Sequence, residues 1–534
     1  MSDTLWISAA QLRRMLRDDE ELALLDVREE GLFGKAHLFY ASCAPLARLE
    51  LLLPRLVPRR GCRVVFCEAA HSQALQAARL ARAHGFDAAF ALAGGHPAAL
   101  AEGFELFSGV NVPSKAFGEY IENRCRTPSL SAAELQGAVE SGEDLVILDS
   151  RPMVEYSVRN IPGAISCPGA ELAYRVHALA PNPRTRVIVN CAGRTRSIIG
   201  AQSLINAGIP NPVAALRNGT MGWHLAGYPL EEGMARVAPA VANQALAAAR
   251  QAGQRLAQKF QVRDIDRREL AQWREQREQR SLYVFDVRHP EEYRQGHLAG
   301  SRCAPGGQLI QETEQFMASL GARVVLVDDN GVRATLTASW LQQMGWPEVR
   351  VLKPGIGADA GLETGMEVQP PALGLEELVV RSIAPSNLNS LLALGQAKIF
   401  DVSLHGHYQD GHIPGALNVL RSDLPEALAG DVGPAAMVVS SEEGELATLA
   451  VHDLQALSGV DARVLTGGNQ AWQRAGLPLE PGPGRCLHPP VDRYQRPYEK
   501  DWGDEQAMQD YLNWEVALIP KLERDGSALF LSGA

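Results

Sequence analysis

Several patterns that assign a protein class at once are missing from this sequence. Its eight cysteines, at positions 43, 62, 67, 125, 167, 191, 303 and 486, form no CxxC pair and follow no regular spacing, which excludes a disulfide framework and a zinc site. No run of about 18 apolar residues occurs, and the N-terminal stretch lacks the apolar core of a secretory signal. We therefore expect no membrane partner and a cytoplasmic location, where a reactive thiol stays reduced.

An excess of basic charge is also missing. Lysine and arginine number 51 against 62 acidic residues, which gives a net charge of -11 and a pI near 5.7. With no basic stripe to offset the acidic surface, a nucleic-acid partner is excluded, and any anion binding must be local. The 46% hydrophobic and 21% charged composition is that of a globular protein, and 534 residues suggest roughly three to five domains.

What the sequence does contain is a fourfold internal repeat. Four short apolar strands end on an aspartate, and each is followed 40 to 42 residues later by the end of a second apolar strand. The aspartates are Asp26, Asp149, Asp286 and Asp401, and the second strands end at Cys67, Cys191, Asp328 and Ser441. A third strand and a glycine-rich turn follow in each copy. Strands that alternate with helical patterns predict an α/β fold, with four tandem domains that each have a parallel sheet and helices on both faces.

The repeat sets the expected domain boundaries. We expect copies one to four at residues 1–112, 127–233, 262–368 and 378–483, followed by a C-terminal extension at 484–534. Residues 113–126 indicate a short amphipathic helix between copies one and two. Residues 234–261 indicate a longer helical connector, which we expect to divide the chain into two pairs of domains. The extension has helical spacing from about Asp504 to Leu522, and its aromatic residues favour packing across a domain seam over ligand binding.

Copy two contains the strongest candidate for chemistry. The β-branched run Val187 to Val189 ends at Cys191, and after a short polar loop an apolar helical pattern begins near Ser197. A cysteine between a buried strand and a helix N-terminus faces backbone N–H groups that stabilise a thiolate. Arg194 and Arg196 in the same loop have no acidic residue between them, so we expect them to lower the thiol pKa further and to hold an anion.

The motif Cys-x-Gly-Arg-x-Arg-Ser after a valine-rich strand resembles the active-site loop of the rhodanese sulfurtransferases. The extended segments before the second strands, such as GHIPGALNVL at 411–420, are similar to that family as well. The loop from Cys191 to Arg196 has six residues, as in sulfurtransferases, whereas related phosphatases have one more. The resemblance covers about residues 1 to 483.

The resemblance implies a thiosulfate sulfurtransferase with rhodanese-like domains. Cys191 would be the nucleophile that carries a persulfide, and the donor would bind to the rest of the loop, namely Ala192, Gly193, Arg194, Thr195, Arg196 and Ser197. The implied partners are thiosulfate as donor and cyanide or a thiol as acceptor. No metal or organic cofactor is needed, and a homo-oligomer is left open.

The loops of the other copies predict no sulfur transfer. Cys67 in copy one has Glu68 beside it and no loop arginine, and a negative neighbour raises a thiol pKa and repels an anionic donor. In copy three Asp328 occupies the cysteine position, and in copy four Ser441 stands among three glutamates. We expect copies one, three and four to be inactive.

Other interpretations stay open at this point. The protein could be a non-catalytic or carrier persulfide scaffold for a partner protein. On the same fold it could use mercaptopyruvate, although the two loop arginines favour thiosulfate. A thiol phosphatase or arsenate reductase is disfavoured by the loop length. Asp149 and Arg151 recur in copies whose loop lacks a cysteine, so we expect them to form an ion pair that holds the fold.

Overall fold

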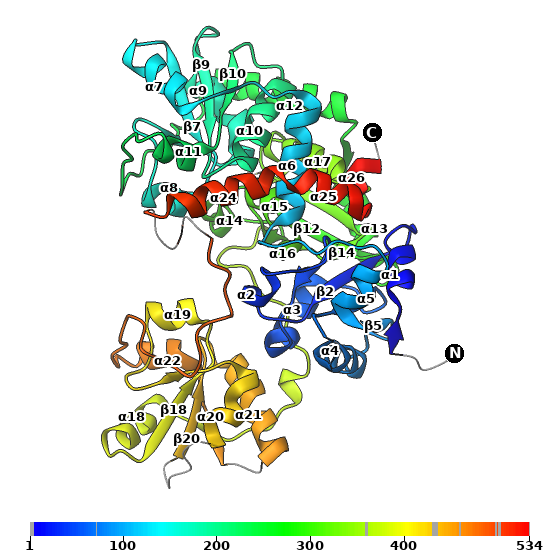
Figure 1. The fold of residues 1–534 in the computed structure, drawn as a ribbon, viewed down its shortest axis with the longest axis vertical. Helices are drawn as coiled ribbons and strands as arrows, with labels where there is room; N and C mark the ends of the chain where they lie inside the picture. Colours follow the sequence, from blue (N-terminus) through cyan, green and yellow to red (C-terminus); the bar gives the residue numbers. More distant parts are fainter. Residues whose placement is uncertain are drawn as a thin grey trace.

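The computed structural model of the chain describes residues 5–70, 72–357, 361–429, 436–458, 461–496, 499 and 503–532. Each copy of the repeat forms one mainly parallel sheet with helices packed on its faces (Figure 1). In every copy the strand that ends on the aspartate lies beside the second strand. These two buried strands form the centre of each sheet, as apolar runs on both faces require.

Copy one forms a sheet with the order β1-β5-β4-β2-β14, with β3 paired to β2. Its own strands are β1 (Trp6–Ile7), β2 (Leu22–Asp26), β3 (Ser42–Cys43), β4 (Arg63–Cys67) and β5 (Ala89–Leu92). Its helices are α1 (Ala9–Met15), α2 (Glu30–Phe33), α3 (Leu49–Leu56), α4 (Ser72–Ala83) and α5 (Gly95–Ala101). The edge strand β14 (Ser319–Leu320) comes from copy three and pairs with β2 in the antiparallel direction, so copies one and three share a sheet.

Copy two forms a sheet with the order β6-β10-β9-β7-β8. The strands are β6 (Ser129–Leu130), β7 (Leu145–Asp149), β8 (Ile165–Ser166), β9 (Arg186–Asn190) and β10 (Val213–Leu216). The helices are α7 (Ala132–Glu140), α8 (Met153–Val158), α9 (Leu172–Leu179), α10 (Thr195–Asn206) and α11 (Gly219–Leu225). The loop that contains the candidate cysteine joins β9 to α10.

Copy three repeats this order as β11-β16-β15-β12-β13. The strands are β11 (Arg263–Ile265), β12 (Leu282–Asp286), β13 (Arg302–Cys303), β15 (Arg323–Val327) and β16 (Glu348–Leu352). The helices are α13 (Arg267–Glu275), α14 (Pro290–Gln295), α15 (Gly306–Gln311), α16 (Thr313–Phe316) and α17 (Arg333–Gln343).

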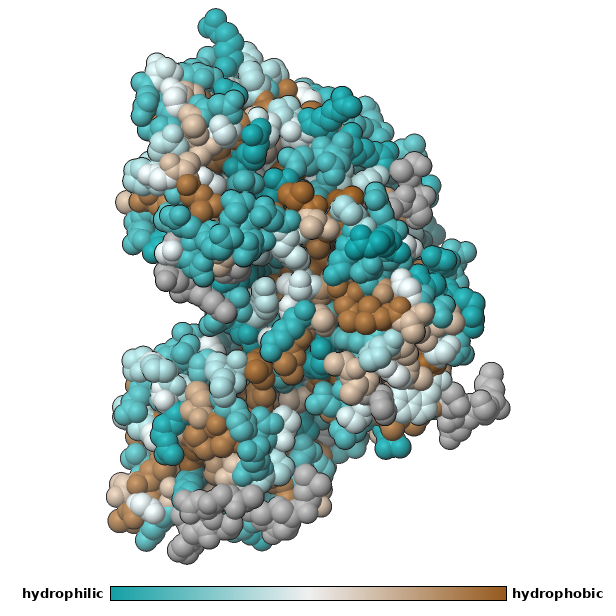
Figure 2. Space-filling model, in the orientation of Figure 1, coloured by the Kyte–Doolittle hydropathy of each residue, from teal (hydrophilic) through white to brown (hydrophobic). Residues whose placement is uncertain are grey.

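Copy four has the order β17-β21-β20-β18-β19-β22. The strands are β17 (Ser382–Ile383), β18 (Ala397–Asp401), β19 (Leu417–Asn418), β20 (Ala436–Ser440), β21 (Ala462–Leu465) and β22 (Arg485–Cys486). The helices are α18 (Pro385–Ala393), α19 (His405–Asp410), α20 (Leu424–Ala429), α21 (Glu445–Ser458) and α22 (Gly468–Arg474). Copy four lies beside copy one, and the surface is hollowed between copy four and the part formed by copies two and three (Figures 1 and 2).

The two connectors are helical but lie deeper than we expected. Helix α6 (Val112–Cys125) is buried along most of its length, and it packs against α10 and the C-terminal helices. Helix α12 (Asn243–Phe260) packs between α9 of copy two and α17 of copy three. The prediction that this connector divides the chain into two pairs of domains is therefore wrong. The connector joins copies two and three, because the small side chains on its alanine-rich face let the helix pack closely against both α9 and α17.

Copies two and three share the largest apolar cluster, which includes Trp340 of α17 and Phe117 of α6. The indole of Trp340 donates to the hydroxyl of Ser203, across the seam, at 2.8 Å. The C-terminal helices α24 (Glu505–Val516), α25 (Leu518–Asp525) and α26 (Leu529–Ser532) run from copy two towards copy one, in red in Figure 1. The extension therefore packs across a seam, as predicted. Within the described residues, no helix combines the length and apolar composition needed to span a bilayer.

Candidate active site

Cys191 is the first residue after β9, and backbone contacts fix the loop that it starts. The carbonyls of Cys191 and Ala192 accept hydrogen bonds from the N–H groups of Thr220 at 2.8 Å and Met221 at 3.0 Å. Gly219 has a φ of +56°, and a Cβ there would lie 2.3 Å from the carbonyl oxygen of Cys191. Only glycine allows this approach, so the glycine-rich turn after the third strand fixes the cysteine loop.

The loop presents unpaired backbone N–H groups. Within the described residues, the N–H groups of Ala192 to Thr195 donate to no protein acceptor. Consecutive N–H groups at the start of a buried helix form a concave site that favours an anion. The Cys191 side chain is 2% exposed, and its Sγ lies 3.5 Å from the Ser197 hydroxyl, which donates to the carbonyl of Arg194 at 2.8 Å.

The pKa of the Cys191 thiol differs from the prediction. Burial raises the pKa of Cys191, and the charge of Arg196 and the hydrogen bonds of Ser197 only partly oppose this effect. The expected lowering by Arg196 is present, but the net direction is the opposite, because the expectation left out the desolvation of the buried thiol and the nearby charge of Glu515.

Both loop arginines are already paired. Arg194 donates to the two carboxylate oxygens of Glu119 at 2.7 and 2.8 Å and also pairs with Glu122, and both glutamates belong to α6. Arg196 donates to the two oxygens of Glu155 in α8, both at 2.7 Å. The loop has no acidic residue in sequence, but the fold supplies three. In copy three, Arg333 and Glu292 form the ion pair that corresponds to Arg196 and Glu155. This ion pair therefore forms without a cysteine in the loop.

The pocket over Cys191 is lined by seven residues of copy two and by six residues from other parts of the chain. Lys115 enters from α6, Gln311 and Glu312 enter from copy three, and the C-terminal extension contributes Arg496, Tyr511 and Glu515. Sequence reasoning missed all six residues. None belongs to the repeated motif, and the one available signal was the aromatic helical pattern of the extension.

The strand register corrects the assignment of copy one. Asp26 pairs with Cys67 in the sheet as Asp149 pairs with Asn190, so Cys67 is equivalent to Asn190 and Glu68 is equivalent to Cys191. The sequence spacing already indicated this equivalence, since Glu68 follows Asp26 by 42 residues, as Cys191 follows Asp149. Because side chains alternate along a strand, a shift of one residue turns Cys67 away from the loop. His71 of this loop lies outside the described residues.

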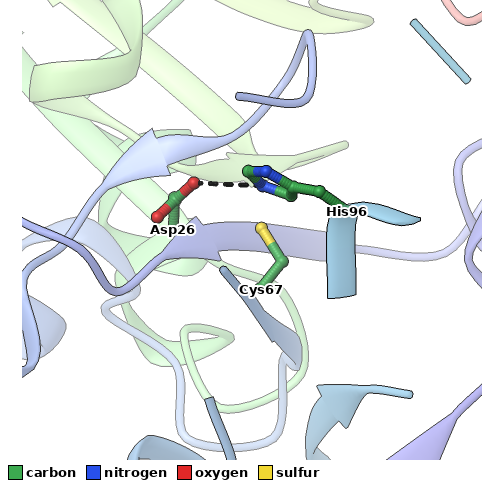
Figure 3. Close-up of side chains that lie close together, drawn as sticks. All are labelled: Asp26, Cys67 and His96. Carbon is green, nitrogen blue, oxygen red and sulfur yellow. Dashed lines mark ion pairs between the residues drawn. The ribbon is translucent and has the colours of Figure 1, made fainter. Parts of the chain in front are cut away.

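Cys67 faces Asp26 and His96 inside copy one (Figure 3). Within the described residues, this is the group whose donor atoms lie close enough for a metal ion, all within 4.8 Å of one another. Both carboxylate oxygens of Asp26 already accept from Arg28, at 2.9 and 2.6 Å, and His96 Nε2 lies 3.5 Å from Asp26. In copy four Asn469, which like His96 follows the turn glycine, donates to Asp401 at 2.7 Å. We therefore interpret the group as a structural brace.

The other three loops fill their own anion sites. In copy three the carboxylate of Asp328 accepts from the N–H groups of Gly331 at 2.7 Å and Ala334 at 3.1 Å. Glu68 accepts from Ala74 N–H at 2.8 Å, and the hydroxyl of Ser441 accepts from Ala447 N–H at 3.2 Å. In each of these copies one donor stands six residues after its acceptor, as Ser197 stands after Cys191. In copy two a thiol takes the place of the oxygen side chain.

The repeated aspartate and arginine form the predicted ion pair. Arg151 Nη2 lies 2.7 Å from Asp149 and also donates to the carbonyl of Arg159 at 2.7 Å. Copies one and three contain the same pair with Asp26 and Asp286. Since it joins the end of the first strand to the following segment in copies without the cysteine, its role is structural.

Comparison with known proteins places this geometry in a family. The sequence model of the Rhodanese-like domain matches residues 8–102, 131–226, 266–359 and 384–475. The crystal structure of a thiosulfate sulfurtransferase from Pseudomonas aeruginosa is 46% identical, covers 98% of both chains and superposes with a TM-score of 0.93.

Two curated relatives match single stretches of about one domain. An HTH-type transcriptional regulator of Mycobacterium tuberculosis is 34% identical over 105 residues, which are 20% of this chain and 45% of the regulator. A putative sulfur carrier protein of Bacillus subtilis is 31% identical over 102 residues, which are 18% of this chain and 54% of the carrier. The chain spans about half the length of these curated relatives. With four matched domains and a full-length structural relative, the chain belongs to the rhodanese family.

Proposed function

We propose that the protein is a sulfurtransferase that moves sulfur from thiosulfate to cyanide or a thiol through a persulfide on Cys191. The observation that carries the proposal is the loop of copy two, where unpaired N–H groups surround a thiol, while the other three loops are closed by Glu68, Asp328 and Ser441. The likeness to the thiosulfate sulfurtransferase of P. aeruginosa supports the same donor.

In the first half-reaction, the Cys191 thiolate attacks the outer sulfur of thiosulfate. The bond between the two sulfur atoms of the donor breaks, and sulfite leaves with its electron pair. The N–H groups from Ala192 to Ser197 would hold the oxyanion end and the developing charge. Arg196 and Ser197 favour the thiolate against the cost of burial.

The paired arginines act differently from two free cations. Since Glu155 neutralises much of the charge of Arg196, the backbone is the main anion holder, and the arginines fix the loop around it. We propose that Arg194 positions the loop against α6 and that Arg196 is the loop cation that acts on the thiol. In the second half-reaction the acceptor attacks the outer persulfide sulfur, and Cys191 is released as a thiolate.

A steady-state assay tests the proposal. Thiosulfate and mercaptopyruvate are each compared as donors with cyanide and with thiols as acceptors, and intact mass is measured after donor treatment. We expect turnover with thiosulfate and one added sulfur atom per chain. Sulfur loading without turnover would support the second candidate, a persulfide carrier, which the likeness to the putative sulfur carrier favours. Hydrolysis of aryl phosphates without sulfur loading would overturn both.

A further inference from the structure

The extension brings an unusual carboxylate to the pocket. Glu515 of α24 is 2% exposed and lines the same pocket as Cys191. Its Oε1 accepts from the Thr195 hydroxyl at 3.5 Å, which fixes the carboxylate against the cysteine loop. Its Oε2 would lie 3.2 Å from a Cβ built on Gly193, so the carboxylate stands directly beside the loop that would hold the donor.

One oxygen of this carboxylate has no partner. Within the described residues, Glu515 Oε2 is buried and makes no hydrogen bond. An unsatisfied buried carboxylate oxygen is costly, and a native site keeps one where an ordered water or a ligand completes the bonding. In the ionised form this oxygen can only accept, so the partner that fits this form is a proton donor. Thiosulfate and cyanide anions carry no proton to donate, whereas a thiol acceptor does.

Charged groups from several elements face Glu515. Lys115 and Glu119 approach from α6 and Arg194 approaches from the loop, and the Tyr511 side chain of the same helix is hydrogen-bonded to the carboxylate. Burial raises the pKa of Glu515, and the positive charge of Lys115 opposes this effect. Lys115 is itself buried; its Nζ donates to the carbonyl of Val110 at 2.7 Å and lies 4.9 Å from the ring centroid of Trp514. The carboxyl can therefore hold or release a proton near neutral pH, as a proton carrier must.

We propose that Glu515 relays a proton from a thiol acceptor to the sulfur that is being transferred. It thereby serves thiol acceptors and is dispensable for cyanide. The inference rests on the proposed function, because it assigns a residue to the second half-reaction. It also gives the C-terminal extension a direct part in the chemistry, in addition to its packing.

The relay balances without any further reactant. The donor step leaves Cys191 as an anionic persulfide. An incoming thiol gives its proton to the Glu515 carboxylate, which passes the proton to the outer persulfide sulfur. The thiolate attacks that sulfur and forms the new sulfur–sulfur bond. The bond to Cys191 Sγ breaks, and its electron pair stays on Cys191 as a thiolate. The cyanide anion attacks the same sulfur with no proton to remove.

The test compares Glu515→Gln with the unmodified protein at one pH, using thiosulfate as donor and three acceptors. These are 2-mercaptoethanol, an acidic arenethiol that is already ionised, and cyanide. We expect kcat with 2-mercaptoethanol to fall about a hundredfold, while the rates with the arenethiol and cyanide stay within about threefold. Glu515→Asp should restore part of the 2-mercaptoethanol rate.

Asp510→Asn, which removes an exposed carboxylate from the same helix, is the matched control and should change none of the three rates. The relay is overturned if Glu515→Gln slows all three acceptors equally, which would assign Glu515 to loop structure, or if it slows none. The proposed function fails separately, in the unmodified protein, if thiosulfate gives no transfer to cyanide. Intact mass after thiosulfate shows in each variant whether Cys191 is still loaded.

Discussion

At the scale of single residues, one position in each loop separates the copies. Glu68, Cys191, Asp328 and Ser441 occupy equivalent places after their second strands. A carboxylate or hydroxyl there accepts from the N–H groups of its own loop, whereas the thiol leaves most of them open. We therefore expect the side-chain atom that faces the helix N-terminus to decide which copy can transfer sulfur.

The two buried cysteines at the ends of β4 and β9 give the first prediction. Cys191→Ala should abolish sulfur transfer and sulfur loading, because it removes the nucleophile. Cys67→Ala should keep most of the rate, because Cys67 faces Asp26 and His96 inside copy one and lies outside the loop. The thiosulfate and cyanide assay with intact mass measures both. Comparable loss in a folded Cys67 variant would require a second site.

Arg196 gives the second prediction. Arg196→Ala should reduce turnover of thiosulfate by about tenfold to a hundredfold, since a charged hydrogen-bond donor is lost beside the thiol and Glu155 is left unpaired. Turnover of mercaptopyruvate, which carries one charge, should fall less. The ratio of the two kcat/KM values measures this difference. An unchanged thiosulfate rate would mean that the loop backbone alone holds the donor.

The ion pair of Arg196 and Glu155 gives a pH-dependent prediction. Arg196 lowers the pKa of Glu155 from 4.5 to about 2. Because the folded pKa lies below the unfolded one, the pair stabilises the fold above about pH 4.5, and this contribution is lost as the pH falls towards 2. Glu155→Gln should lower the free energy of unfolding by about 1–2 kcal/mol at pH 7, since the Glu155 side chain is 26% exposed.

Chemical denaturation at several pH values measures this effect. The difference between Glu155→Gln and the unmodified protein should shrink below pH 4.5, because a protonated glutamate resembles glutamine. Glu140→Gln, an exposed position in the same copy, serves as the control and should show no such trend. A difference that stays constant down to pH 2 would exclude the ion pair as its source.

Sequence was enough for the strand, loop and helix around Cys191, because a strand, a short polar loop and a helix start are all local patterns. It was not enough for the partners of that loop. Glu119, Glu155 and Glu515 reach it from three different helices, and no spacing in the chain announces these contacts. Cys67 shows a second limit of sequence-based prediction, because a shift of one residue in strand register moves a side chain to the opposite face of the sheet.

At the scale of elements, α24 is the wall that completes the pocket. Met508 and Leu512 pack on Met221 of α11, and Trp514 lies against Gly109. The helix was predictable from its spacing, and so was its packing on a seam. Its place in the pocket beside Cys191 was not predictable. Apolar periodicity identifies which face of a helix is buried, but it does not identify the part of the protein against which that face packs.

Loosening this helix should expose the thiol. Leu512→Ala removes a buried side chain from the contact with Met221 and should destabilise the docking of α24 by about 2–4 kcal/mol. Alkylation of Cys191 by iodoacetamide should then accelerate, because the helix opens more often. Val516→Ala is the matched control, since Val516 of the same helix is 52% exposed.

The rate of Cys191 alkylation is followed by peptide mass, and hydrogen exchange over residues 505–516 reports the opening of the helix. An accelerated exchange without accelerated alkylation would show that another element covers the thiol. Equal alkylation rates in the two variants would contradict the assignment of α24 as the wall.

At the scale of the whole molecule, copies one to three are joined by a shared sheet and a shared apolar cluster, and copy four contacts copy one. Arg421 of copy four pairs with both carboxylate oxygens of Glu50 in α3, at 2.9 and 3.0 Å. The segment after copy four contacts α2, where Gly31 N–H donates to the carbonyl of Val491 at 2.8 Å. Four repeats were predictable, but their arrangement was not, because tandem copies of one motif carry no sign of which faces meet.

Copy four should not be needed for sulfur transfer. Arg421→Met leaves Glu50 buried without its partner and should loosen copy four, because an uncompensated buried charge destabilises a contact. Small-angle scattering should show a larger radius of gyration, while the rate with thiosulfate and cyanide stays within about twofold. Arg381→Met, at an exposed ion pair inside copy four, is the control. A large loss of activity in Arg421→Met alone would show that copy four supports the site.

The pocket residues are far apart in the sequence, from Lys115 to Glu515, so they are synthesised at different times. Copy two is synthesised before Gln311 and Glu312 of copy three, and Arg496, Tyr511 and Glu515 follow later still. Since domains fold in the order of their synthesis, the nascent loop waits without its walls. The thiol gains these surroundings only when copy three and helix α24 dock on the loop, so copy two by itself carries the motif without the complete pocket.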